Sequence, residues 1–159
     1  LVLRGHGLRL RQVLGPLTPG GPAQMVTVQV RRYRCTACRA IITVAPRGVL
    51  RRRLYSASAI GWVLARLGLD GAATAQVRAE VSPSTVTGHR AVDRWITAAR
   101  WVEASRGGKL FPRLGPHAAS SRRRQIAERT AMQLVALAHC DGTTEILAHA
   151  AFAGAALAA

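Results

Sequence analysis

The chain has 159 residues, enough for one ordinary domain or two small ones, and its 49% apolar content can supply a hydrophobic core, which excludes a disordered composition. Its charge is lopsided: 23 basic residues, all arginine except Lys109, stand against seven acidic ones, for a formal net charge of +16. A GC-rich coding sequence would explain arginine in place of lysine, but not the shortage of carboxylates. The balance favours a polyanion, and we expect DNA, with RNA as the alternative.

Cysteine usage and the ends of the chain bear on location. Three cysteines, an odd number, do not make a disulfide framework, so a reducing cytoplasm fits best. The chain starts with leucine and no signal-peptide pattern follows, so we expect it to begin inside a longer reading frame or to have been trimmed. The longest apolar stretch, residues 148–159, has 12 residues where a membrane span needs about 20. We therefore expect a cytoplasmic protein without a membrane partner.

The first half of the chain predicts a small β unit. Residues 1–24 contain "RGHG" and "GPLTPGGP" and predict an extended segment followed by a turn-rich loop. From residue 25 to 35 apolar and polar residues alternate, with valines on one face, as in a half-buried strand. Residues 40–46 predict a second short strand. The two strands make a hairpin whose turn holds Cys35 and Cys38.

Helical patterns dominate the rest. Ser56 is expected to cap a helix over residues 57–69, and a shorter helix fits residues 73–81. Apolar residues at helical spacing are expected on one face of the first of these helices: Ile60, Val63, Leu64 and Leu67. Ser82 is a good N-cap for a third helix over residues 84–103, with Pro83 at the first helical position, where its missing N–H costs nothing. Two further helices are expected near residues 121–139 and 145–157.

The fold class predicted from these elements is α+β, mainly α. A short, partial zinc-ribbon-like β-hairpin is followed by a three-helix, helix-turn-helix unit and an alanine-rich helical tail. The expected domains are 1–50 for the hairpin, 51–105 for the helix-turn-helix unit, 106–120 for a Gly-, Pro- and Ser-rich linker and 121–159 for the tail.

The C-x2-C pair of Cys35 and Cys38 is the clearest chemical motif. At a hairpin tip, a tight turn directs two thiolates at one zinc ion, and a structural site needs four ligands. The sequence places two there, since Cys140 is a hundred residues away. Half of a zinc ribbon is favoured, with a metal-free relic as the main alternative. A redox pair is disfavoured because a strand, and not a helix, follows the cysteines.

The stretch from residue 72 to 95 has the layout of a helix-turn-helix: a short helix, a tight turn and a capped helix whose first turns carry small polar residues. Hydroxyl side chains allow close approach to base edges, and arginines can hold phosphates. An ordinary helical hairpin with a solvated basic face is the alternative. The residues predicted to contact DNA are Ser82, Ser84, Thr85, Thr87, Gly88, Arg90, Arg94, Arg31, Arg32, Arg34, Arg51, Arg52 and Arg53.

Nothing in the sequence argues for an enzyme. The seven acidic residues are scattered, without the paired setting of a two-metal nuclease or transferase. No phosphate-binding glycine loop or nucleophile elbow is present. We therefore predict no catalytic residues.

Two segments resemble a known family. "VQVRRYRCTACRAIITVAPRG" is similar to the second half of the N-terminal zinc ribbon of bacterial insertion-sequence transposases, and "VSPSTVTGH" resembles the helix-turn-helix that follows it. The resemblance spans roughly residues 25–100 and implies that Cys35 and Cys38 are the second ligand pair of a zinc site. Arg39 and Glu80 stand where such proteins often have glycine.

The acidic catalytic domain of such a transposase is missing from this chain. The resemblance therefore implies a sequence-specific DNA-binding protein of transposase-like origin. The alternatives are an RNA- or protein-binding module that uses the basic hairpin, a decayed transposase fragment, or an enzyme whose catalytic half is encoded elsewhere.

Overall fold

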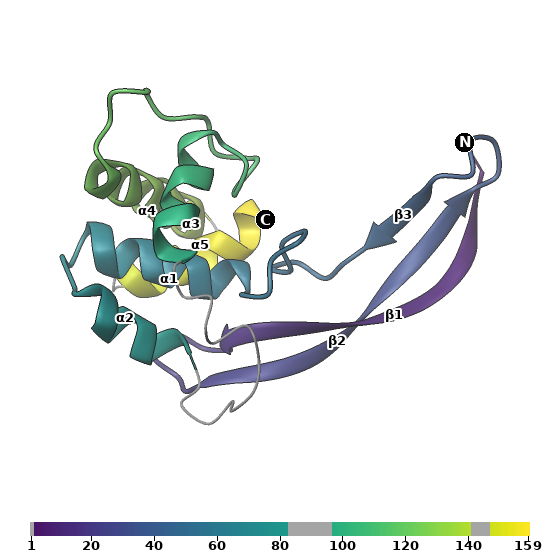
Figure 1. Ribbon diagram of the computed structural model, residues 1–159, viewed down its shortest axis with the longest axis horizontal. Helices are drawn as coiled ribbons and strands as arrows, with labels where there is room; N and C mark the ends of the chain where they lie inside the picture. Colours follow the sequence, from purple (N-terminus) through teal and green to yellow (C-terminus); the bar gives the residue numbers. More distant parts are fainter. Residues whose placement is uncertain (1, 83–96, 141–146) are drawn as a thin grey trace.

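The computed structural model describes residues 2–82, 97–140 and 147–159. In these residues the protein is α+β, with one three-stranded antiparallel sheet and five helices. The sheet is a long twisted arm that extends away from a body formed by the helices (Figure 1). The coarse prediction of an α+β protein with an antiparallel hairpin is thus confirmed.

The arm consists of β1 (Leu3–Pro16), β2 (Ala23–Cys35) and β3 (Ile41–Val44), in the order β1-β2-β3. We call these three strands the ribbon. The predicted hairpin of the second and third strands is present, with the cysteines in its turn. The extended segment and the loop expected before it are present, but the extended segment was not predicted to be a strand, and it pairs with β2 over nearly its whole length. The alternation of Leu8, Arg9, Leu10 and Arg11 has the two-residue period of a strand.

Four of the described helices begin and end within two residues of the predicted positions, whereas for the third predicted helix, over residues 84–103, the expected start lies outside the described residues. Ser56 caps the first helix as expected, since its hydroxyl accepts a hydrogen bond from the Ala59 N–H at 3.0 Å. Gly71 follows the end of that helix with φ +66°, a conformation that favours glycine. The described helices are α1 (Ala57–Gly68), α2 (Thr74–Val81), α3 (Thr97–Arg106), α4 (Arg123–Cys140) and α5 (Leu147–Ala158).

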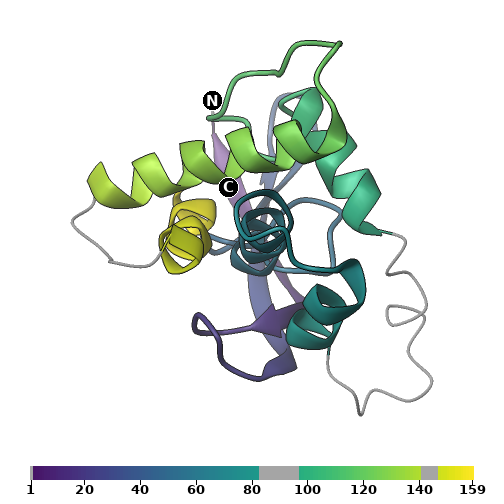
Figure 2. The same cartoon turned by 90° about the vertical axis from the view of Figure 1, so that its left-hand side faces the viewer.

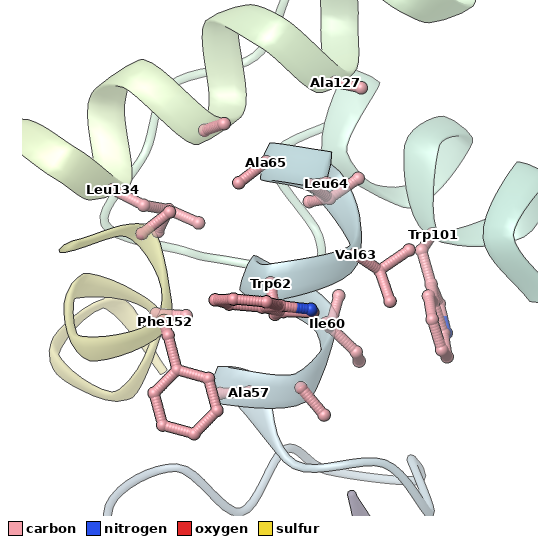
Figure 3. Close-up of a cluster of buried hydrophobic side chains, with 14 of the residues drawn as sticks. Ala57, Ile60, Trp62, Val63, Leu64, Ala65, Trp101, Ala127, Leu134 and Phe152 are labelled. Carbon is pink, nitrogen blue, oxygen red and sulfur yellow. The ribbon is translucent and has the colours of Figure 1, made fainter. Parts of the chain in front are cut away.

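The core forms around α1. Ile60, Val63 and Leu64, predicted to share one face, are fully buried, and Trp101 of α3 packs beside them (Figure 3). Figure 2 shows α1 surrounded by the other helices, with α5 beside it and α4 running across both. The alanine-rich helices α4 and α5 therefore complete the same core as α1. Small residues suit this role because they let helix backbones approach closely.

The base of the ribbon is bound to the body through the connector, residues 45–56. Leu14 is 2% exposed, its N–H donates to the Leu54 carbonyl at 2.9 Å, and its carbonyl accepts from the Ser56 N–H at 3.0 Å. The guanidinium of Arg11 donates to the carbonyls of Leu50 and Arg53. These contacts hold the proximal part of the ribbon, whereas its distal part stands clear of the helices (Figure 1).

Glu80 joins α2 to α1. Its carboxylate accepts hydrogen bonds from the Trp62 indole N–H at 2.7 Å and from the Arg66 guanidinium at 3.1 and 3.2 Å. Burial alone would raise the pKa of Glu80, but the hydrogen bonds from Arg66 and Trp62 outweigh it and lower the pKa. Glu80 lies in the last turn of α2, and not in a tight turn between two helices as predicted, and it anchors α2 to α1.

Replacing Glu80 by glutamine is expected to lower the free energy of unfolding by about 1 to 2 kcal/mol at neutral pH, because charge-assisted hydrogen bonds are lost from a mostly buried carboxylate. The folded pKa lies below the unfolded one, so the contribution of Glu80 is complete above the unfolded pKa and is lost as pH falls through the folded value. Urea unfolding from pH 7 to pH 3 measures both effects. Glu128→Gln, at an exposed position of α4, is the matched control, and an equal loss in both variants would contradict the assignment.

Candidate nucleic-acid interface

Five arginines share one face of the ribbon; one of them, Arg11, is engaged by the connector, and the other four lie further toward the distal tip. Residues directly opposite each other in antiparallel strands carry their side chains on the same face, and residues two apart along a strand do so too. Arg4 lies opposite Arg34, and Arg9 lies opposite Val30. Arg32 is two residues from Arg34 and two from Val30 along β2, so it lies on the same face as both. We call Arg4, Arg9, Arg32 and Arg34 the arginine face.

The opposite face of the distal ribbon is mainly apolar. Leu8 and Leu10 are 58% and 64% exposed on β1, and Val44 of β3 lies opposite Arg31. Of the three predicted arginines on β2, Arg31 therefore lies on this face, away from Arg32 and Arg34. Sequence spacing placed all three in one basic run, but strand alternation divides them.

The arginine face concentrates positive charge without compensation. Residues 1–69 contain twelve arginines and no aspartate or glutamate. Arg4 and Arg34 are direct cross-strand neighbours, an arrangement of like charges that destabilises an isolated sheet. An anion on this face relieves that repulsion, so the ribbon is suited to a polyanion.

Sequence reasoning missed Arg4 and Arg9 because it treated the first 24 residues as an unpaired extended segment followed by a loop. The signal was present in "LRLRQV", where leucine and arginine alternate with the period of a strand. The pairing of this segment with the valine-rich strand could not be read from local sequence.

The predicted basic connector has a mainly structural position. Arg51 and Arg52 are exposed, whereas Arg53 is half-buried and its carbonyl accepts a hydrogen bond from Arg11 at 2.8 Å. Arg52 has φ +57°. The connector lies at the base of the ribbon, so Arg51 and Arg52 extend the positive surface toward the body.

The cysteine turn forms a knuckle at the distal tip of the ribbon. The Cys35 N–H donates to the Ala40 carbonyl at 2.9 Å, and the Arg39 N–H donates to the Cys35 carbonyl at 3.0 Å. Hydrogen bonds from the Cys38 backbone, the Cys38 side chain and the Ala37 backbone lower the pKa of Cys35. Backbone N–H groups directed at a sulfur favour the thiolate, which is the form that binds metal.

Both thiols of the knuckle are free, with Cys35 buried and Cys38 exposed. Among the residues that the structure describes, no third His, Cys, Asp or Glu joins them in a group that could hold a metal ion. The donor set fits two of the four positions of a tetrahedral zinc site.

Arg39 adopts φ +58°, the left-handed conformation, immediately after the second cysteine. Arg39→Gly is therefore expected to stabilise the protein by up to about 1 kcal/mol, since relief of the left-handed strain exceeds the extra freedom glycine gives the unfolded chain. Thermal and urea unfolding measure the change. Arg47→Gly, at an exposed arginine outside the left-handed region, serves as the control and is expected to destabilise slightly. Equal effects at both positions would contradict the strain argument.

The predicted helix-turn-helix is described only in part. α2 and the turn to Ser82 are present, and Val81 is fully buried as expected. The Ser82 hydroxyl lies 2.8 Å from the Tyr55 hydroxyl, which ties the turn to the connector. The other predicted contact residues of this unit lie outside the described residues: Ser84, Thr85, Thr87, Gly88, Arg90 and Arg94.

Comparisons of this chain with protein-family models, curated proteins and solved structures found no match. No helix in the described part of the chain is both long and apolar enough to cross a membrane.

Proposed function

We propose that this protein binds duplex DNA, with the arginine face of the ribbon on the phosphate backbone and the helix that follows Ser82 reading base edges. The observation that carries the proposal is the arginine face itself: four arginines on one side of the ribbon, whose distal part stands clear of the body. An arm without carboxylates loses no binding energy to internal ion pairs, so its charge is available to phosphates.

The dimensions of the ribbon support this use. At about 3.3 Å per residue, the 13 residues of β2 span about 40 Å, comparable to one turn of duplex DNA. Guanidinium groups bind phosphate oxygens in a bidentate manner, which suits arginine better than lysine for this contact. Phosphate contacts position a protein, and base contacts specify a sequence. In the proposal the ribbon contacts phosphates and positions the protein, and the helical unit contacts bases and specifies the sequence. This division is expected of a transposase-like DNA-binding region.

The direct test is fluorescence anisotropy with a duplex DNA of about 20 base pairs and with a structured RNA of equal charge, over a salt series. We expect tighter binding to duplex DNA and a log–log salt dependence that corresponds to several phosphate contacts. Equal or tighter binding to the RNA would favour the alternative of an RNA-binding module. Absence of duplex binding at 50 mM salt would overturn the proposal.

The knuckle is proposed as half of a zinc site, with the remaining ligands supplied from outside the described residues. Purified protein is then expected to carry at least about half an equivalent of zinc per chain, and Cys35→Ser is expected to lose it. Metal analysis by mass spectrometry of both proteins measures this. If the zinc content of Cys35→Ser equals that of the wild type, the assignment of Cys35 as a zinc ligand is contradicted. A wild-type protein without zinc would favour the alternative that the knuckle is a metal-free relic of a zinc ribbon.

A further inference from the structure

A cleft of about 630 Å³ opens in the helical body, away from the ribbon. Its walls come from the turn between α1 and α2, from α2, from the start of α3 and from the start of α4. Figure 2 shows these elements around one end of α1. The volume lies in the range of sites that bind small organic ligands, about 300 to 1,000 Å³.

Three arginines line this cleft and no acidic residue does so among the described ones. Arg78 comes from α2, and Arg123 and Arg124 come from the first turn of α4. Arg124 reaches across to the α1–α2 turn, where its Nη2 lies 3.4 Å from the position that a Cβ on Gly71 would occupy. Arg123 is 69% exposed, and its Nε donates a hydrogen bond to a Glu103 carboxylate oxygen at 3.4 Å, within a solvent-exposed ion pair. The cleft is thus strongly electropositive.

The remaining wall is apolar. Leu67, Val102 and Ala127 line the cleft, and the last two are almost fully buried. A ligand that matches both parts needs an anionic group for the guanidiniums and a flat, weakly polar group for the wall. A carboxylate carries one negative charge and two acceptor oxygens, whereas a phosphate monoester carries up to two negative charges and three acceptor oxygens that guanidiniums bind in pairs. The base of a nucleotide supplies the flat group.

We propose that this cleft binds a nucleoside monophosphate, with the phosphate held by Arg78, Arg123 and Arg124 and the base against Leu67 and Val102. The site goes beyond the DNA contact proposed for the ribbon and does not depend on it. The same chemistry is offered by a free mononucleotide and by the 5′-phosphorylated end of a DNA strand.

Isothermal titration with adenosine 5′-monophosphate, adenosine and inorganic phosphate tests the site. We expect the nucleotide to bind at least tenfold more tightly than either fragment, because only the nucleotide uses both walls. The double variant Arg123→Gln/Arg124→Gln is expected to lose at least tenfold in affinity, whereas Arg113→Gln/Arg122→Gln, which removes two exposed arginines outside the cleft, is expected to bind like the wild type. Equal affinities in the two double variants, or for nucleotide and phosphate, would overturn the proposal.

A second variant tests the cleft without removing charge. Ala99 lines the cleft and is exposed, so Ala99→Trp is expected to occupy the space and to abolish nucleotide binding while the protein stays folded. Circular dichroism and urea unfolding verify the fold of each variant. Retained nucleotide affinity in a folded Ala99→Trp protein would place the ligand elsewhere and overturn the assignment.

Competition identifies the source of the nucleotide. Displacement of bound nucleotide by a 5′-phosphorylated oligonucleotide, but not by its 5′-hydroxyl form, supports capture of a strand end. Displacement by neither supports a free nucleotide, and equal displacement by both contradicts phosphate-ester recognition. Loss of ribbon arginines is expected to leave nucleotide affinity unchanged, so failure of this site and failure of the proposed DNA binding are separable.

Discussion

Replacing Gly154 by alanine is expected to destabilise the protein by about 3 kcal/mol or more. Gly154 lies in α5 where that helix crosses α4, and a Cβ on it would overlap the carbonyl oxygen of Leu134 and lie 2.7 Å from the carbonyl carbon. The clash is with backbone, so no side-chain rotation relieves it. Helix propensity alone would make the Gly154→Ala protein more stable by up to about 1 kcal/mol. The sign of the measured change therefore distinguishes the backbone clash from the effect of helix propensity.

Urea denaturation followed by circular dichroism measures this change in the free energy of unfolding. Gly115→Ala is the control, because Gly115 has no positive φ and nothing lies within 4 Å of its added Cβ, so a change within about 0.5 kcal/mol is expected. If Gly154→Ala were neutral or stabilising, the close crossing of α4 and α5 would be wrong. Gly61, whose Cβ would lie 2.5 Å from that of Ala155, offers an independent check of the packing of α1 against α5.

Replacing Arg9, Arg32 and Arg34 by glutamine is expected to weaken binding to duplex DNA by roughly a hundredfold or more at 0.1 M salt. Each arginine that contacts a phosphate contributes about 0.9 to the log–log salt slope, so the slope is expected to fall by about three. Arg9 and Arg34 are exposed and Arg32 is half-buried, so stability is expected to change little. The measurement is anisotropy over a salt series, with unfolding curves recorded in parallel.

The matched control removes the same charge from the helical body. Arg100, Arg113 and Arg122 are exposed on α3, in the loop after it and before α4, and their replacement by glutamine also lowers the net charge by three. If net charge alone drove binding, both triple variants would weaken it equally. A salt slope that changes equally in the two would therefore contradict the arginine face as the docking surface.

Much of the local structure was predictable from sequence because it depends on short-range periodicity and capping. The helix after Ser56 and the positions of Ile60, Val63 and Leu64 in the core followed from a 3.6-residue pattern and a capping hydroxyl. The first strand was not predicted, although its alternation of leucine and arginine was visible. The glycines and the histidine of "RGHG" interrupt the alternation of apolar and polar residues, so the segment does not have a clear strand pattern over its whole length. Its pairing with β2 shows that it is a strand.

The candidate site was predictable in composition but not in arrangement. The knuckle of Cys35 and Cys38 could be recognised from spacing, and Arg32 and Arg34 were rightly placed on the hairpin. Their association with Arg4 and Arg9 depends on cross-strand register, which relates residues about thirty positions apart. The arginine run before Gln125 was visible in the sequence, but its meeting with Arg78 of α2 across the cleft was not, because the two helices are far apart in the chain.

The sequence by itself determined the excess of arginine, the cysteine pair in its turn and the helices and strands with clear periodicity, since these depend on residues a few positions apart. Only the tertiary structure decided which arginines share a face, which groups Glu80 of α2 binds on α1 and how the alanine-rich helices α4 and α5 bury α1. These features depend on contacts between residues far apart in the chain: the strand register, the hydrogen bonds of Glu80 with Trp62 and Arg66, and the close approach of a glycine to a neighbouring backbone. The pattern of nearby residues in the sequence does not predict such contacts.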